Sequence, residues 1–215
     1  MATSELTPDE TREMLLQVCR GMQASKDRLS EADRAIGDGD HGVGMARGFE
    51  AVQRKLEAIS SAAAIDELFR TVGTALLTSV GGAAGAVFGT LFRGGSQNLS
   101  DCSAFDAAAL ARLLTDGLAA VKARGQAQPG DKTMVDALEP AARRAQQLTG
   151  APIGEALTEV AEAARQGMEK TRQMVATVGK AKTLGERSLG HPDPGAISTY
   201  LILTYMAEYA SRDRS

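Results

Sequence analysis

Apolar residues recur at intervals of three or four along almost the whole chain, the spacing that places them on one face of an α-helix. A representative run is Ile153, Leu157, Val160, Ala164 and Met168. The strict alternation of apolar and polar residues that is typical of half-buried strands is missing. The pattern therefore predicts an all-α protein.

Helix start signals and glycines suggest where the predicted helices begin and end. Thr7 precedes Pro8 as a cap before a proline at the first helical position, and Pro152 opens another helix. We expect eight helices, at residues 8–31, 43–59, 65–79, 85–96, 104–124, 133–148, 153–178 and 194–211. Because the joins are mostly short and no Pro/Ser-rich linker divides the chain, we expect one domain over residues 1–215, with sequential helices antiparallel.

Composition and charge narrow the class of protein. The chain has 215 residues, 43% of them hydrophobic, and a formal charge of -3 with acidic and basic residues interspersed. A chain of this length can bury a core without crosslinks, and this charge gives no field for a nucleic-acid backbone. Two distant cysteines imply neither a zinc site nor a disulfide framework. Without a leader or an apolar run of roughly 18 residues, we expect a cytoplasmic protein with no nucleic-acid or membrane partner.

The most informative segment carries three carboxylates, Asp33, Asp38 and Asp40, within eight residues. Holding two carboxylates about 4 Å apart costs on the order of 4 kcal/mol at a surface-like effective dielectric, so the cluster favours a cation. The ligands are hard oxygens, which suit Mg²⁺ or Ca²⁺ better than zinc. The alternative is a solvated acidic loop that caps a helix.

Three common motifs do not explain this chain. If Asp38 opened an EF-hand loop, Val43 would replace the required Gly and Phe49 the required Glu. The G-x-G-x-x-G match at residues 37–42 follows a helical pattern instead of a strand, so it is not a dinucleotide fingerprint. Lys132 lacks the preceding Gly of a Walker A motif. What remains is a glycine-permitted turn that opens a helix, whose free N–H groups favour an anion beside the metal. A metal beside an anion suggests a nucleotide phosphate.

Polar and glycine residues concentrate in four joins, which an up-and-down bundle would place at one end: 33–45, 79–89, 124–136 and 179–195. The glycines of residues 79–85 would allow a close phosphate approach or simply a tight interhelical turn. The last join is long enough to be functional, and Lys180, Lys182 and Arg187 could meet phosphate charge there or form surface pairs. We expect His41, one of two histidines, to serve as a hydrogen-bonding residue.

Taken together, four segments of the sequence resemble the nucleotide-binding L subunit of dihydroxyacetone kinases. They are residues 32–42, 79–85, 130–134 and 184–196. The resemblance extends over essentially the whole chain, in order and at the family's spacing. It implies a closed barrel of eight antiparallel helices with a deep pocket at one end.

The resemblance also implies the ligands and the residues that would hold them. Asp33, Asp38 and Asp40 would bind two Mg²⁺ ions that bridge the phosphates of ADP or ATP. The nucleotide contacts that it implies are His41, Gly42, Val43, Gly44, Ala83, Ala84, Gly125, Met134, Lys180, Asp193, Pro194 and Gly195. Because phosphoryl transfer asks mainly for positioning and charge neutralisation, no catalytic base is expected on this chain.

The chain departs from the family's pattern at several of these positions. Gly44 stands where the family has Asn, Ala84 where it has Ser, and Lys180 where it has Arg. Lysine keeps a point charge but loses the planar fork of arginine, and alanine removes a hydroxyl donor. Lys182 and Thr183 replace Ser and Tyr. We therefore expect fewer side-chain donors at the phosphates.

By resemblance, the chain would supply the phosphoryl group to dihydroxyacetone or a related short ketose that a separate K subunit holds covalently. In one mode, ADP stays bound as a cofactor and is rephosphorylated by a phosphohistidine-carrying M subunit of the phosphotransferase system. In the other mode, ATP exchanges as a substrate. The absence of a fused K domain favours the first mode. The alternatives are a tetrulose kinase subunit, a regulatory module whose nucleotide state a transcription regulator reads, and a structural bundle.

Overall fold

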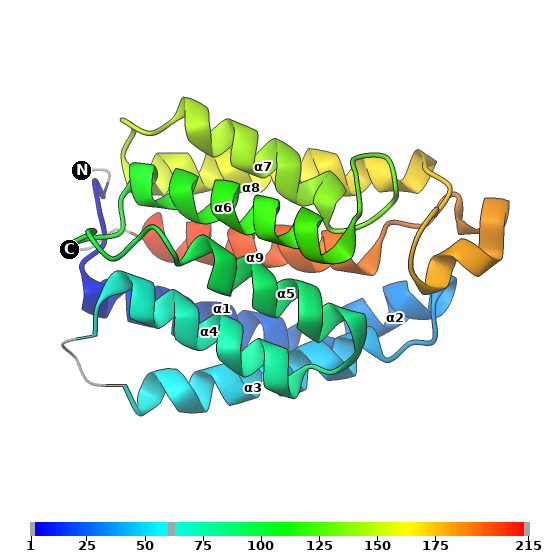
Figure 1. The fold of residues 1–215 in the computed structure, drawn as a ribbon, viewed down its shortest axis with the longest axis horizontal. Coiled ribbons are helices and arrows are strands. Elements are labelled where there is room, and N and C mark those ends of the chain that lie inside the picture. Colours follow the sequence, from blue (N-terminus) through cyan, green and yellow to red (C-terminus); the bar gives the residue numbers. More distant parts are fainter. Residues whose placement is uncertain (1–2, 60–62, 213–215) are drawn as a thin grey trace.

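The computed structural model describes residues 3–59 and 63–212, and this part of the chain is built from helices. Its elements in chain order are α1 (Pro8–Ala24), α2 (Lys26–Ile36), α3 (His41–Glu57), α4 (Ile65–Ser79), α5 (Gly82–Gly95), α6 (Ala107–Gly125), α7 (Val135–Gln147), α8 (Ile153–Lys170), the 3-10 turns η1 (Thr171–Gln173) and η2 (Lys180–Ser188), and α9 (Pro194–Ala210). The predicted all-α class is confirmed (Figure 1). The outermost residues of the predicted domain 1–215 lie outside the described residues.

The predicted count of eight helices is not confirmed, because the described residues hold nine α-helices. The first predicted helix is divided at Ser25 and then continues to Ile36. The Ser25 hydroxyl donates to the carbonyl of Gly21 at 2.9 Å and lies 2.7 Å from the hydroxyl of Tyr205. A serine that bonds the backbone in this way competes with regular helix geometry, and the kink follows.

The helix predicted over residues 153–178 ends early, at Lys170. The backbone tightens into the short turn η1 and then leaves the bundle. Thr171 carries this change, because its hydroxyl donates to the carbonyl of Met168 at 2.6 Å and its own carbonyl accepts from the N–H of Met174 at 3.2 Å. The polar segment that follows belongs to the long connection to α9.

Local capping explains where several helices begin. Thr7 and Glu10 form a reciprocal capping box, in which the Thr7 N–H donates to the Glu10 carboxylate at 2.8 Å and the Glu10 N–H donates to the Thr7 hydroxyl at 3.3 Å. Pro8 follows as the first helical residue, as predicted. Asp106 and Asp193 cap α6 and α9 with their carboxylates.

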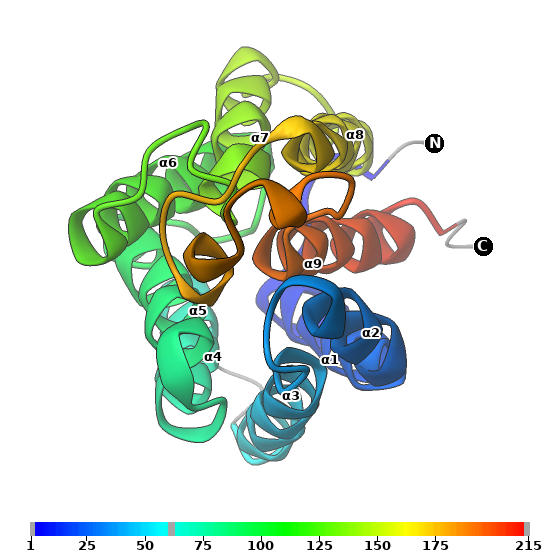
Figure 2. The same ribbon diagram turned by 90° about the vertical axis from the view of Figure 1, so that its right-hand side faces the viewer.

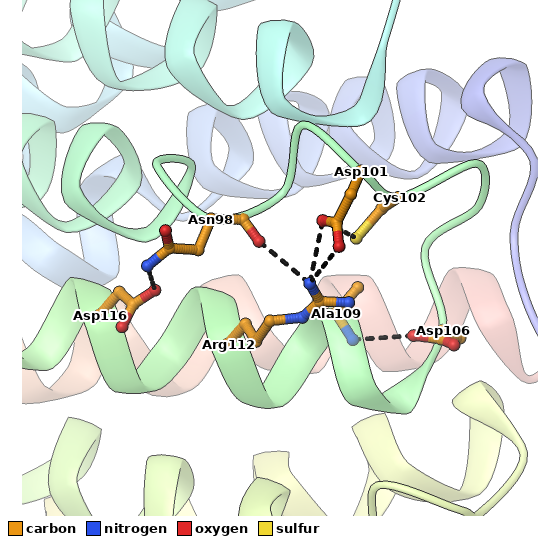
Figure 3. Close-up of polar contacts among 7 residues, drawn as sticks. All are labelled: Asn98, Asp101, Cys102, Asp106, Ala109, Arg112 and Asp116. Atoms are coloured by element: carbon orange, nitrogen blue, oxygen red, sulfur yellow. Dashed lines mark hydrogen bonds and ion pairs between the residues drawn. The ribbon is translucent and has the colours of Figure 1, made fainter.

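The loop between α5 and α6 is ordered by a polar network that Figure 3 shows in close-up. Arg112 on α6 donates to the Asp101 carboxylate at 3.0 Å and to the carbonyl of Asn98 at 3.2 Å. The Asn98 amide donates to Asp116 at 2.9 Å. An antiparallel bridge pairs the end of this loop with the segment before α1. These contacts fix the loop at the start of α6.

The helices run along one long axis and pack in sequence order (Figures 1 and 2). Each helix from α3 to α9 packs against the next, and α1 packs against both α3 and α9. Glycines allow the close approaches: a Cβ on Gly89 of α5 would lie 2.9 Å from the carbonyl oxygen of Gly73 on α4. Helix α9 is largely buried among its neighbours, as its all-round apolar sequence predicts.

The four predicted joins do lie at one end of the bundle. The connections α2–α3, α4–α5, α6–α7 and α8–α9 lie there, and the long α8–α9 connection occupies the middle of the end-on view, between the other three (Figures 1 and 2). Among the described residues, no helix combines the length and the apolar character that crossing a membrane requires.

Candidate functional site

The four connections enclose a cleft with a volume of about 570 Å³, within the usual range for ligand pockets. Every metal or nucleotide contact that the family resemblance implies lines this cleft except Gly42. Lys182 and Arg187, which the sequence analysis also considered for phosphate charge, do not line it and are exposed. Gly42 instead lies between two helices: a Cβ there would stand 2.1 Å from the Lys26 carbonyl oxygen and 2.4 Å from the Ser30 hydroxyl. Its small size lets α3 begin directly against α2.

The three aspartates converge at one edge of the cleft. Asp33 comes from the last turn of α2, Asp38 from the turn and Asp40 from the residue before α3, and one oxygen of each lies within 4.8 Å of the others. Asp33 is buried, and its carboxylate accepts from the N–H of His41 at 3.1 Å. A Cβ on Gly37 would lie 2.2 Å from the Asp33 carboxylate, so glycine leaves room for that side chain.

The donor set of this cluster fits Mg²⁺, because all three groups are carboxylate oxygens. The ammonium of Lys180, from the α8–α9 connection, hydrogen-bonds Asp38 and lies 3.5 Å from Asp40. That hydrogen bond lowers the pKa of the Asp38 carboxyl and raises the pKa of Lys180. The place between the carboxylates therefore stabilises positive charge.

Among the described residues, two helices begin at the cleft without a side-chain cap from the residue that precedes them, although the first N–H of α3, that of His41, donates to Asp33. These are α3 after Asp40 and α5 after Gly81. The first N–H groups of a helix have no partner within it, and the helix dipole adds positive potential. Gly81 and Gly82 have φ values of 84° and 57°, a backbone that favours glycine. Ala83 and Ala84 follow in the first turn of α5, where their N–H groups can bind an anion.

Arg47 lines the cleft although the sequence analysis did not single it out. Its Nε donates to the carbonyl of Ser79 at 2.7 Å and its Nη2 to the carbonyl of Val80 at 2.6 Å. These bonds hold the end of α4 and hence the glycine turn that opens α5. The signal was present in the sequence, because Arg47 follows Val43 by one helical turn and so shares its face.

Lys132 is the second residue that sequence reasoning missed as part of the site. Its side chain is only 2% exposed, and its ammonium donates to the carbonyls of Thr171 at 2.5 Å and His191 at 2.6 Å. Burial lowers its pKa. The neighbouring Asp136 accepts from the N–H of Gly130 at 2.6 Å and shapes the same loop. Because the lysine's partners are backbone carbonyls far along the chain, the sequence offers no pattern that would reveal them.

The floor of the cleft joins α3 to the start of α9. The His41 imidazole lies 2.8 Å from the hydroxyl of Ser198, and burial lowers its pKa, which favours the neutral ring. Asp193 accepts from the N–H of Ala196 at 2.7 Å, and desolvation raises the pKa of its carboxyl to about 7. The histidine is thus hydrogen-bonded, in agreement with the sequence analysis.

These features describe a helical protein whose cleft offers hard oxygen ligands for a metal and backbone donors for an anion. The chain belongs to the DAK2 domain family, whose model matches residues 35–208.

Relatives and solved structures agree with this membership. The chain is 40% identical over 184 residues to the PEP-dependent dihydroxyacetone kinase, ADP-binding subunit DhaL, of Escherichia coli, covering 83% of this chain and 86% of that protein. It is 35% identical over 201 residues to L-erythrulose 1-kinase of Mycolicibacterium smegmatis, covering 93% of this chain and 35% of that protein. The crystal structure of the dihydroxyacetone kinase from C. freundii in complex with AMP-PNP and Mg²⁺ superposes with a TM-score of 0.72 at 27% identity, covering 92% of this chain. The chain spans 33% of that kinase.

Proposed function

We propose that this chain is the nucleotide-binding L subunit of a dihydroxyacetone kinase, or of a kinase for a related short ketose. It would pass a phosphoryl group from its nucleotide to a ketone held by a separate K subunit. The family membership and the names of the relatives support this proposal. The observation that carries it is the cleft, where three carboxylates face the uncapped starts of α3 and α5.

Within this proposal, Asp33, Asp38 and Asp40 hold two Mg²⁺ ions, which neutralise phosphate charge when bound. The N–H groups at the starts of α3 and α5 bind the phosphate oxygens. The apolar side of the cleft, which includes Val121 and Met134, takes the nucleoside. Arg47 and Lys132 fix the loops around it. Such a preorganised set of donors is what phosphoryl transfer requires from a protein.

Two sources of the phosphoryl group fit this site. The names of the DhaL relatives describe PEP-dependent kinases and ADP-binding subunits, and they favour bound ADP that a phosphohistidine-carrying M subunit rephosphorylates. The L-erythrulose kinases favour a tetrulose substrate. The C. freundii kinase structure, which holds AMP-PNP and Mg²⁺, favours ATP as the exchanging donor. A transcription regulator that reads the nucleotide-loaded state is a further proposed partner. The proposal includes a cytoplasmic location and a single domain.

The test is reconstitution with a purified K subunit, dihydroxyacetone or L-erythrulose, and either ATP or phosphoenolpyruvate with the phosphotransferase proteins. We expect sustained formation of the phosphorylated ketose. Asp38→Asn should abolish it while the circular dichroism spectrum is unchanged. Asp101→Asn is the matched control, because it also neutralises an ion-paired aspartate but lies in the α5–α6 loop. Absence of turnover with every donor and ketose would refute the proposal.

A further inference from the structure

The α8–α9 connection leaves the bundle and returns to it through a narrow neck. We call its outer part, residues 174–190, the excursion. At the neck, the N–H of Gly190 donates to the carbonyl of Arg172 at 2.8 Å, and the N–H of Asp193 donates to the hydroxyl of Thr171 at 2.9 Å. The two ends of the excursion therefore lie side by side, although nearly twenty positions separate them in the sequence.

The buried ammonium of Lys132 holds both sides of this neck. It donates to the carbonyl of Thr171, where the excursion leaves α8, and to the carbonyl of His191, where the chain returns toward α9. In the described part of the chain it forms no ion pair with a carboxylate, so these two bonds are its direct partners. The Thr171 carbonyl also stands at the C-terminal, negative end of α8, where a cation is favoured.

Asp131, the residue before Lys132, holds the excursion at a second point through hydrogen bonds to Thr177. The hydroxyl of Thr177 donates to the carboxylate of Asp131 at 2.5 Å, and the N–H of Thr177 donates to the Asp131 carbonyl at 3.3 Å. Lys132 itself has a φ of 61°, a left-handed backbone that few side chains adopt, and this turn directs its side chain inward. The α6–α7 loop thus acts as the base on which the excursion rests.

The excursion in turn supplies one wall of the cleft. Val178, Gly179, Lys180 and Ala181 line it, and Lys180 hydrogen-bonds the Asp38 carboxylate. The position of Lys180 relative to the carboxylates therefore depends on the contacts that hold the two sides of the neck together.

We propose that Lys132 is a positioning residue that fastens both ends of the excursion, sets the placement of Lys180 over the carboxylate cluster and thereby slows release of the bound nucleotide. The claim about nucleotide release rests on the proposed function. The claim that Lys132 holds the two ends of the excursion depends only on contacts within this chain.

Limited trypsin digestion tests the fastening without any ligand. The excursion contains three exposed cleavage sites, Lys180, Lys182 and Arg187. Lys132→Met keeps the length of the side chain but removes two charge-assisted hydrogen bonds, so cleavage at these sites should accelerate roughly tenfold or more, because cleavage follows the population of the open form. Cleavage on helices, as at Arg54, should not accelerate.

A matched control is Lys122→Met, which removes a partly buried ammonium that pairs with Glu139 at 2.6 Å on the same helix-loop unit. Its cleavage pattern in the excursion should equal that of the wild type. If Lys132→Met does not fold, Thr177→Val removes the hydroxyl bond of the second attachment and keeps its backbone bond, and a smaller increase confined to the same sites is expected. The proposal would be overturned if Lys132→Met accelerated tryptic cleavage equally at all sites of the chain, or if it did not accelerate cleavage in the excursion.

The second readout is the dissociation rate of a fluorescent ADP analogue with Mg²⁺. We expect Lys132→Met to raise this rate roughly tenfold, with little change for Lys122→Met. If the wild type binds no nucleotide, the proposed function fails while the digestion result still stands. If the wild type binds and Lys132→Met releases the analogue at the same rate, the positioning role fails.

Discussion

Gly42→Ala should disturb both the fold and the cleft, because no space exists for the added methyl group. The new Cβ would lie 2.1 Å from the carbonyl oxygen of Lys26 and 2.6 Å from the backbone nitrogen of Ser30, where ordinary contacts are 3.4 Å or longer. The obstructing atoms belong to the backbone of α2, so no change of rotamer relieves them. Helices α2 and α3 must separate by about 1 Å or distort.

Overpacking of this kind costs about 1 to 3 kcal/mol. For a chain of this length, each kcal/mol lowers Tm by about 2 to 4 °C, so we expect a decrease of roughly 2 to 12 °C. The separation also moves Asp33, on α2, away from Asp40 at the start of α3. Binding of ADP with Mg²⁺ should therefore weaken more than the loss of stability alone explains.

The assay is thermal unfolding followed by titration of ADP in the presence of Mg²⁺. Gly150→Ala serves as the control, since a Cβ on Gly150 meets nothing within 4 Å. The control should match the wild type in both measurements. If Gly42→Ala also matched the wild type in both, the close crossing of α2 and α3 would not be what requires glycine at this position.

Three further predictions address charge and capping. The pKa of Asp193 is raised to about 7 in the folded protein, so its contribution to the free energy of unfolding is present below pH 4 and is lost as the pH rises through 7. This loss amounts to up to about 4 kcal/mol. Asp193→Asn keeps the cap on α9, and it should remove this pH dependence from the free energy of unfolding measured by urea titration. ADP and Mg²⁺ together, at a hundredfold excess over Kd, should stabilise the wild type by about 2.7 kcal/mol in a thermal shift assay, and an equal shift in Asp38→Asn would contradict the metal assignment. Thr7→Ala should cost about 1 kcal/mol by removing half of the capping box, and unchanged chemical unfolding would show that the box contributes nothing.

Features of the fold that depend on residues close in sequence could be predicted, and features that depend on contacts between residues far apart in sequence could not. The start of α1 at Pro8 depends only on Thr7 and Glu10, which are close in sequence. The kink at Ser25 depends partly on Tyr205, a residue of the last helix, so no local pattern could place it. The helical periodicity therefore predicted the class of fold and most helices, but not their number.

The same distinction applies to the candidate site. The convergence of the three carboxylates could be predicted because they lie within eight residues, on the two sides of one turn. The role of Lys132 could not, because its partners are carbonyls of Thr171 and His191 that only the folded chain brings near. For Gly42, the sequence could not separate a ligand contact from a close helix crossing, and the structure places it in the crossing.

The nucleotide content of the freshly purified protein tests the central claim most directly. Acid would release any bound nucleotide, and chromatography would identify and quantify it, before and after dialysis against a chelator. We expect ADP near one equivalent per chain, retained through ordinary dialysis, lost with the chelator and absent from Asp38→Asn. A protein that carries no nucleotide and binds neither ADP nor ATP when Mg²⁺ is supplied would contradict the assignment of the cleft as a nucleotide and metal site.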